Sequence, residues 1–197
     1  MTDSSRRPFG SAQDRLRPGP NLMVYVGLGS NLAHPRRQLS RALAELSRLP
    51  RTRMVAASPN YVSAPLGVTE PQPDYVNAVA ALRTALSARA LLRRLQSIER
   101  RHGRKRRRSD ARNAARTLDL DLLLFGGRRV RLPQLTVPHP RMHERAFVLK
   151  PLLDVAPTAS IPGRGSARSL LHGLRGQRIA RTRSHRFRQP TARHGNR

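Results

Sequence analysis

The sequence predicts an α+β sandwich of the ferredoxin-like βαββαβ kind, with helices packed on one face of an antiparallel sheet. Two observations lead to this prediction. Apolar segments with strand-like and helix-like patterns follow one another in the order strand, helix, strand, strand, helix, strand. The chain has 197 residues, a length that suits one domain with a single core.

The first predicted elements are a strand and an amphipathic helix. Residues 22–28 are an apolar run that stops at the turn Gly29-Ser30-Asn31, as a buried first strand does. Leucines and alanines then recur at helical spacing over residues 35–49, with arginines on the opposite face. This pattern predicts a helix that buries one side against the sheet.

The next predicted elements are two strands and a second helix. Residues 54–62 and 75–84 read as strands, and a loop rich in proline and glycine separates them at residues 64–73. Leucine and isoleucine recur at helical spacing over residues 87–102, between a serine suited to cap a helix and a glycine suited to end one. The second helix is therefore predicted there.

A basic loop and the last core strand follow. Residues 104–115 are too basic to be buried and are predicted to form a mobile loop. Residues 116–125 form the next strand, and a two-glycine turn leads to a hairpin partner near residues 130–132. A short helix is predicted at residues 144–153, and residues 157–165 read as the end of the domain.

The composition divides the chain into three parts. We expect a disordered leader at residues 1–22, the folded domain at 23–162 and a disordered arginine-rich tail at 163–197. No apolar run approaches the roughly 18–20 residues that cross a bilayer. The absence of cysteine excludes disulfides and thiolate zinc sites and fits a reducing cytoplasm, where we expect the protein as a monomer.

The charge is strongly positive. The formal net charge is +28, from 39 lysines and arginines against 11 acidic residues. Such an excess predicts affinity for polyanions, either nucleic acid or phosphate-rich substrates. The cations gather in a cluster between Arg100 and Arg116 and in the tail after Gly163, so the two regions need separate explanations.

Two aspartates stand out in the strand of sequence RTLDLDLLLF. Side chains alternate along a strand, so Asp119 and Asp121 share one face while the intervening leucines point into the core. Two carboxylates this close favour a cation between them, and magnesium prefers such oxygen ligands together with phosphate. A solvated edge strand explains the alternation equally well. The nearby Arg116 and Arg104 favour a phosphate site.

The first turn does not match a nucleotide or hydrolase motif. Gly27 and Gly29 resemble the start of a dinucleotide fingerprint, but its third glycine would fall on Leu32. Ser30 is not part of a nucleophile elbow. The turn therefore either shapes the end of the strand or takes a direct part in the site.

Several aromatic and histidine side chains are ambiguous from the sequence alone. His139 lies between two prolines, in a rigid extended segment that fixes its ring, and His143 competes with it for any ligand role. Tyr75 and Phe147 are ordinary core candidates by residue type.

Five segments in order resemble the 6-hydroxymethyl-7,8-dihydropterin pyrophosphokinase family. They are YVGLGSNL, APLGVTEPQPDYVNAV, LQSIERRHGR, RTLDLDLLLFG and LTVPHPRMHERAFVLKPLLDVAP, and together they span roughly residues 23–162. The resemblance implies transfer of pyrophosphate from ATP to the hydroxymethyl group of a reduced pterin in folate biosynthesis, with release of AMP. It also implies two mobile catalytic loops.

The resemblance further implies roles for individual residues. Two magnesium ions would be held by Asp119 and Asp121, with Arg104 and Arg116 as further catalytic residues. The pterin would contact Ser63, Ala64, Leu66, Tyr75, Asn77 and Phe147. ATP would contact Gln96, Glu99, Arg104, Arg116, Thr136, His139 and Arg145.

The chain departs from the family pattern at three places. The family's Trp-Gly-Pro before the RTLDLD arginine is Asn113-Ala114-Ala115 here, a family arginine near the nucleotide falls on Gln134, and a tyrosine after the histidine is Pro140. Two alternatives therefore stay open. One is a homologue that has lost activity, and the other is a basic nucleic-acid-binding protein whose arginine-rich tail makes the contact.

Overall fold

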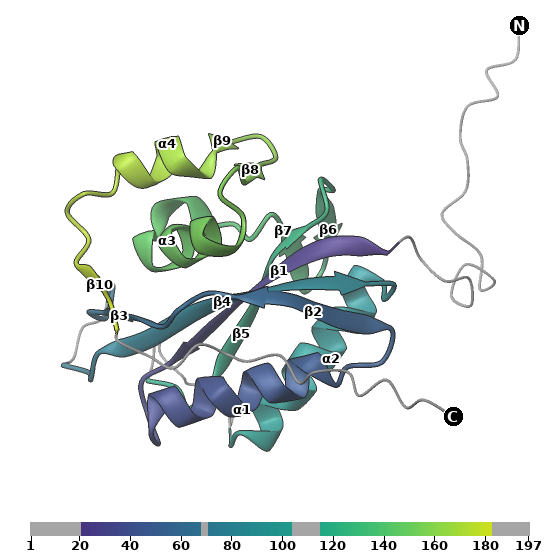
Figure 1. Cartoon of the computed structure of the whole chain (residues 1–197), viewed down its shortest axis with the longest axis horizontal. Helices are drawn as coiled ribbons and strands as arrows, with labels where there is room; N and C mark the ends of the chain where they lie inside the picture. Colours follow the sequence, from purple (N-terminus) through teal and green to yellow (C-terminus); the bar gives the residue numbers. More distant parts are fainter. Residues whose placement is uncertain (1–20, 68–70, 104–114, 183–197) are drawn as a thin grey trace, which may run out of the picture.

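The computed structural model describes residues 21–67, 71–103 and 115–182, and in that part of the chain the central feature is a six-stranded antiparallel sheet (Figure 1). Residues 1–20 of the expected leader, residues 104–114 of the expected basic loop, which include Arg104, and residues 183–197 of the expected tail lie outside the described residues. The strands are β1 (Leu22–Ser30), β2 (Thr52–Ala57), β3 (Tyr61–Ser63), β4 (Tyr75–Thr84), β5 (Asp119–Phe125) and β10 (Ile179–Arg181). Their order is β10-β3-β4-β1-β5, and β2 also pairs with β4.

Helices α1 (Pro35–Ser47) and α2 (Ala88–Arg101) cover one face of this sheet, below it in Figure 1. Their apolar positions are those expected from the helical spacing, with Leu39 and Leu46 of α1 and Leu91 and Leu95 of α2 fully buried against the sheet. The Ser87 hydroxyl accepts a hydrogen bond from Ala90 N at 3.2 Å and caps α2. The α+β fold predicted from the element order is confirmed.

The opposite face of the sheet is also covered, which the sequence did not predict. Helices α3 (Ala146–Val155) and α4 (Ala167–His172) lie above the sheet in Figure 1. A second apolar cluster joins Leu149 and Leu152 of α3 to Val79 and Leu123 of the sheet. Because β4 is covered on both faces, it is buried along most of its length.

The single strand predicted at residues 54–62 is two strands, so that prediction was wrong. Ser58, Pro59 and Asn60 interrupt it between β2 and β3, and both strands pair with β4. Pro59 has no N–H to donate to a ladder. At Ser58 a side chain takes part in the pairing with β4, because the Ser58 hydroxyl accepts the hydrogen bond from Val79 N at 2.9 Å.

The strand predicted at 116–125 is β5 (Asp119–Phe125), and the prediction that residues 130–132 form its hairpin partner was wrong. Strand β6 (Val130–Leu132) pairs instead with β7 (Leu135–Val137) in a separate two-stranded sheet. At Gly126 the backbone adopts a φ of 57° and turns away from β5, a conformation that favours glycine. In the described chain β5 therefore remains at the edge of the main sheet.

The domain boundary at residue 162 was placed too early. Strands β8 (Ser160–Ile161) and β9 (Gly165–Ser166) form a small hairpin, α4 follows it, and β10 pairs with β3. Ala167 is fully buried in the apolar cluster beneath α3 and α4. Folded structure thus extends to residue 182, because scattered apolar residues in this arginine-rich stretch pack onto the second face of the sheet.

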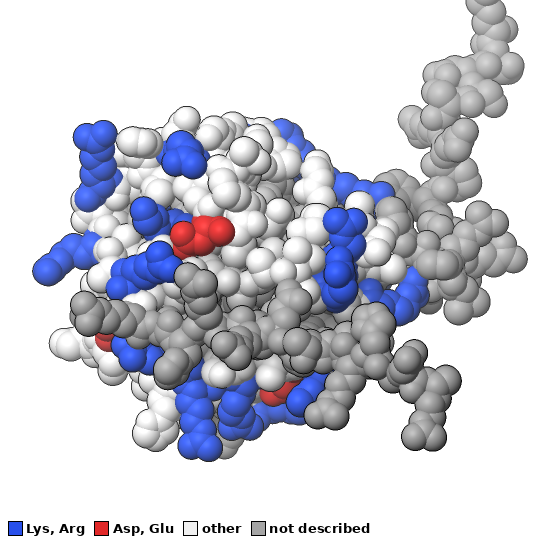
Figure 2. Space-filling view, viewed as in Figure 1, with Lys and Arg blue, Asp and Glu red and all other residues white. Residues whose placement is uncertain are grey.

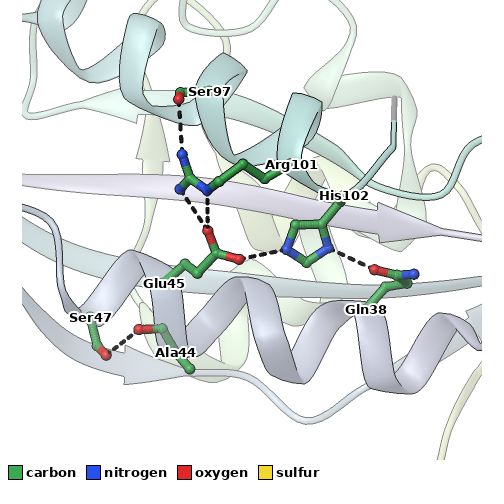
Figure 3. Close-up of polar contacts among 7 residues, drawn as sticks. All are labelled: Gln38, Ala44, Glu45, Ser47, Ser97, Arg101 and His102. Atoms are coloured by element: carbon green, nitrogen blue, oxygen red, sulfur yellow. Dashed lines mark hydrogen bonds and ion pairs between the residues drawn. The ribbon is translucent and has the colours of Figure 1, made fainter. Parts of the chain in front are cut away.

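A polar network joins α1 to α2 (Figure 3). Arg101 Nη2 donates to Glu45 Oε2 at 2.6 Å, and His102 Nε2 lies 2.8 Å from Glu45 Oε1. The other ring nitrogen of His102 lies 2.6 Å from Gln38 Oε1, and the Gln38 amide donates to Ala33 O at 3.0 Å, which fixes its orientation. Burial acts to raise the pKa of Glu45, but the bonds to Arg101 and His102 outweigh it and lower the pKa.

We expect Glu45→Gln to lower stability near neutral pH by about 1 kcal/mol, or a Tm decrease of about 2–4 °C. Because the pKa of Glu45 is lowered in the folded state, its contribution is present above the ordinary value of 4.5 and is lost as the pH falls below it. Thermal unfolding of both proteins across pH 3–8 tests this. A difference in Tm that does not shrink as the pH falls from 5 to 3 would contradict it, and Arg100→Gln on the exposed side of α2 is the control.

Candidate active site

A cavity of about 260 Å³ opens on the same face of the sheet as α3, beside the N-terminus of that helix. Strands β1, β4 and β5 form its floor, and the segment from His139 to Val148 forms one wall. The lining residues are Gly27, Leu28, Gly29, Ser63, Ala64, Leu66, Tyr75, Asn77, Ala78, Val79, Arg116, Asp119, Asp121, Leu123, His139, Arg141, Arg145, Phe147 and Val148. Most of the site residues expected from the sequence are among them.

The two aspartates point into this cavity from β5. Leu118, Leu120 and Leu122 are almost fully buried in the core beneath α1 and α2, while Asp119 and Asp121 are half-buried on the other face. The alternation along the strand therefore gives the expected arrangement. Both carboxylates lie in one cavity and can act on one ligand.

Two glycines leave space beside these carboxylates. Gly27 pairs with Asp121 and Gly29 pairs with Asp119 in the register of β1 with β5. A Cβ at Gly29 would lie 3.4 Å from Asn77 Oδ1, so a larger residue would narrow the cavity. The sequence left the role of this turn undecided, because the pairing of strands far apart in the chain is not visible in it.

Arg116 forms an ion pair with Asp119 at the cavity. Its Nη1 donates to Asp119 Oδ2 at 2.7 Å. Burial acts to lower the pKa of Arg116, but the neighbouring Asp119 carboxylate outweighs burial and raises it. The guanidinium is therefore charged and is held at the edge of the cavity.

His139 is fixed at the other side of Asp121. Its backbone N–H donates to Leu123 O at 3.0 Å, and its Nδ1 accepts from Arg141 N at 3.3 Å. Its Nε2 lies 3.9 Å from Asp121 Oδ2. Burial, and next the charge of Arg145, lowers the pKa of His139 to about 4. The neutral ring thus accepts at Nδ1 and presents an Nε2–H donor toward the cavity.

Flat and apolar surfaces form the remaining wall. Tyr75 and Phe147 both line the cavity, and the guanidinium of Arg145 lies 5.6 Å from the centre of the Phe147 ring. Asn77 is almost fully buried and donates from Nδ2 to Ser63 Oγ at 3.0 Å, so its amide is held in one orientation. Burial is the main cause that lowers the pKa of Arg145.

Three residues expected near ATP do not line the cavity. Gln96 lies on α2, and Thr136 is exposed on β7. Glu99 is buried, and its Oε1 accepts a hydrogen bond from Leu120 N at 2.9 Å, between the two aspartates. Glu99 of α2 therefore stabilises the backbone of β5 from the face of the sheet opposite the cavity. Gln134, where the family often has an arginine, is exposed and also outside the lining.

The turn after β1 connects the two sides of the cavity, a role that sequence reasoning missed. Asn31 Oδ1 accepts from Arg116 N at 2.8 Å, and Asn31 Nδ2 donates to Pro73 O at 3.2 Å. Ser30 Oγ donates to Thr117 O at 2.6 Å. The short polar residues after the strand were the available signal, since such side chains often bond to nearby backbone.

We expect Asn31→Ala to lower stability by about 2 kcal/mol, because Asn31 is buried and its amide bonds join two segments that carry cavity residues. Asn31→Asp keeps the acceptor for Arg116 N and loses the Nδ2 donor to both Pro73 O and Gln72 Oε1, so its effect should report the contribution of the donor side of the amide. Urea unfolding of the three proteins measures both changes. Equal stability of wild type and Asn31→Ala would contradict the connecting role.

The comparisons with known proteins agree on one family. Residues 25–157 match the family described as 7,8-dihydro-6-hydroxymethylpterin-pyrophosphokinase (HPPK). The chain is 55% identical over 139 residues to a 2-amino-4-hydroxy-6-hydroxymethyldihydropteridine pyrophosphokinase of Pseudomonas aeruginosa, covering 71% of this chain and 83% of that protein. It is 47% identical over 141 residues to the enzyme of that name from Haemophilus influenzae, covering 72% and 86%.

Solved structures share the fold at low sequence identity. One described as HPPK-DHPS in complex with substrates matches with a TM-score of 0.61 and 11% identity, over 78% of this chain and 43% of that one. Plasmodium falciparum HPPK-DHPS A437G with STZ-DHP gives a TM-score of 0.64 at 11% identity, over 83% and 47%. This chain thus spans less than half of those solved chains. The matched residues and the close curated relatives show that the chain belongs to the 7,8-dihydro-6-hydroxymethylpterin-pyrophosphokinase family.

Proposed function

We propose that the protein transfers pyrophosphate from ATP to the hydroxymethyl group of 6-hydroxymethyl-7,8-dihydropterin, releasing AMP, in folate biosynthesis. The observation that carries this proposal is the pair Asp119 and Asp121 in one cavity with the rings of Tyr75 and Phe147. The names of the relatives, which are pyrophosphokinases for this pterin, support it.

The aromatic wall suits the pterin. A flat heteroaromatic ring packs favourably against aromatic faces, and Tyr75 and Phe147 both line the cavity. Asn77 supplies a fixed amide to read the polar edge of the ring, with Ser63 behind it. Ala64 and Leu66 border the same region, as the resemblance implied.

The aspartates suit magnesium. Among the described residues no group of three or more His, Cys, Asp or Glu side chains gathers in the way a protein-only metal site requires. Magnesium commonly takes one or two carboxylates and completes its shell with water and substrate phosphates, so Asp119 and Asp121 fit two ions that arrive with ATP. When bound, the ions neutralise charge on the phosphates of ATP.

In the proposed reaction, the hydroxymethyl oxygen attacks the β-phosphorus of ATP and releases its proton to water, the bond from that phosphorus to the oxygen that bridges it to the α-phosphorus breaks, and AMP leaves. No protein nucleophile is needed. Arg116 and Arg145 hold phosphate oxygens through charge-assisted hydrogen bonds, and the His139 Nε2–H donates to the nucleotide. Catalysis then rests mainly on positioning and electrostatic stabilisation.

Binding to nucleic acid explains fewer of the observed features than the proposed pyrophosphate transfer does. Figure 2 shows lysines and arginines scattered over the visible face of the described residues rather than gathered in one patch. That reading also leaves Asp119 and Asp121 without a role. No helix in the described part of the chain is long and apolar enough to cross a membrane.

Phosphorus NMR of the pterin product tests the proposal. We expect a pterin that carries two linked phosphorus atoms, together with AMP, when protein, ATP, magnesium and the pterin are incubated. A pterin monophosphate with ADP would instead indicate a simple kinase, and unchanged ATP with folded protein would indicate a homologue without activity.

A further inference from the structure

Arg141 carries a guanidinium at the cavity that neither the motifs nor the resemblance assigned. It lines the cavity together with Asp121 and His139. Its closest carboxylate oxygen in the described chain is Glu144 Oε2, 3.8 Å from Nε and too far for a hydrogen bond. Its side chain is 47% exposed. Its N–H donors are therefore available to a ligand in the cavity.

The backbone that carries Arg141 is fixed. Arg141 N donates to His139 Nδ1 at 3.3 Å, and Met142 N donates to His139 O at 3.1 Å. Met142 is fully buried at the start of the short helix η2 (Met142–Glu144). The guanidinium is therefore carried by a fixed backbone, so little backbone conformational freedom is lost when it binds a ligand.

The three arginines that line the cavity in the described chain differ in the contacts that their guanidinium groups already make. Arg116 is held by Asp119 at 2.7 Å, and Arg145 lies over the Phe147 ring. Burial is the main cause that lowers the pKa of Arg145; the Asp121 carboxylate acts to raise it, and the charge of Arg141 acts to lower it. Arg141 lines the same cavity as Arg116 and Arg145, so its positive charge adds to theirs and favours an anion there.

We propose that Arg141 binds the triphosphate of ATP, as a further phosphate-binding residue of this site. This inference rests on the proposed function. A guanidinium matches phosphate oxygens with parallel N–H donors, whereas the uncharged pterin offers it no comparable anion. Arg141 then favours nucleotides with several phosphates over nucleosides, and it contributes little to binding of the pterin.

The test is the affinity for ATP of Arg141→Gln, measured by titration calorimetry with magnesium. We expect a Kd raised about tenfold, the effect of losing one partly exposed charged hydrogen bond to phosphate. Arg141→Lys should lose less affinity for ATP than Arg141→Gln, because lysine keeps the positive charge although it lacks the planar pair of guanidinium N–H donors. Arg53→Gln on β2 is the matched control, since Arg53 is also exposed but does not line the cavity.

The affinities for adenosine and for the pterin should stay unchanged in Arg141→Gln. If that variant is unstable, Arg141→Met, which keeps the apolar stem, gives the same comparison. Wild-type protein that forms AMP with the pterin while both variants bind ATP as tightly as wild type would overturn the role of Arg141 alone. Wild-type protein that is folded, binds no ATP and forms no AMP would overturn the proposed function as well.

Discussion

Asp121→Asn should lower the rate of pterin-dependent AMP formation by about a thousandfold or more. Asp121 lies in the cavity opposite Gly27, and it is one of two carboxylates that fit the magnesium ions. The substitution keeps the shape and removes the negative charge, so it weakens charge compensation at the phosphates where the reaction occurs. The kcat at saturating ATP and magnesium measures the effect.

The folded state of Asp121→Asn should be close to wild type in stability, because the repulsion from Asp119 that it relieves is offset by the lost attraction to Arg116 and Arg145. Asp154→Asn is the matched control. Asp154 lies outside the cavity and accepts a hydrogen bond from the Tyr61 hydroxyl at 2.6 Å, which an asparagine oxygen can also accept. Full activity in Asp121→Asn would show that the metal assignment is wrong.

Arg116→Gln should lower kcat/KM by about a hundredfold or more. Arg116 is bonded to Asp119 at 2.7 Å and is held through its backbone by Asn31, so its guanidinium is positioned before ATP binds. A preorganised charged donor in a partly buried site commonly contributes several kcal/mol to transition-state stabilisation. Steady-state rates with both substrates varied measure the loss.

Arg116→Lys should recover part of this loss, because lysine keeps the charge but lacks the planar fork. Arg83→Gln provides the control, since Arg83 is exposed near the far end of β4, opposite Met23. If Arg116→Gln lowers kcat/KM by less than about threefold with stability unchanged, Arg116 does not bind the phosphates.

The parts of the fold and site that were predictable depend on local chain geometry. The alternation of leucine and aspartate over residues 118–122 fixes which side chains share a face, and the helical spacing of leucines fixes the buried sides of α1 and α2. These periodicities follow from covalent geometry, so they hold before any tertiary contact is known.

The features of the fold and site that could not be predicted depend on contacts between segments that are distant in the sequence. The pairing of Gly27 with Asp121 requires the register of β1 with β5, and the second covered face requires α4 and β10 to fold back onto β3 and α3. An arginine-rich composition suggested disorder there, although a few apolar residues suffice to pack against an existing sheet. Arg141 was missed because its position depends on the turn around His139.

The measurement that bears most directly on the proposed function is AMP release from ATP and magnesium, with and without 6-hydroxymethyl-7,8-dihydropterin, by the full-length wild-type protein and by Asp121→Asn. We expect AMP from the wild type only when the pterin is present, and almost none from the variant. Folded wild-type protein that releases no AMP, or AMP release that does not depend on the pterin, would contradict the assignment of this cavity as a pyrophosphokinase active site.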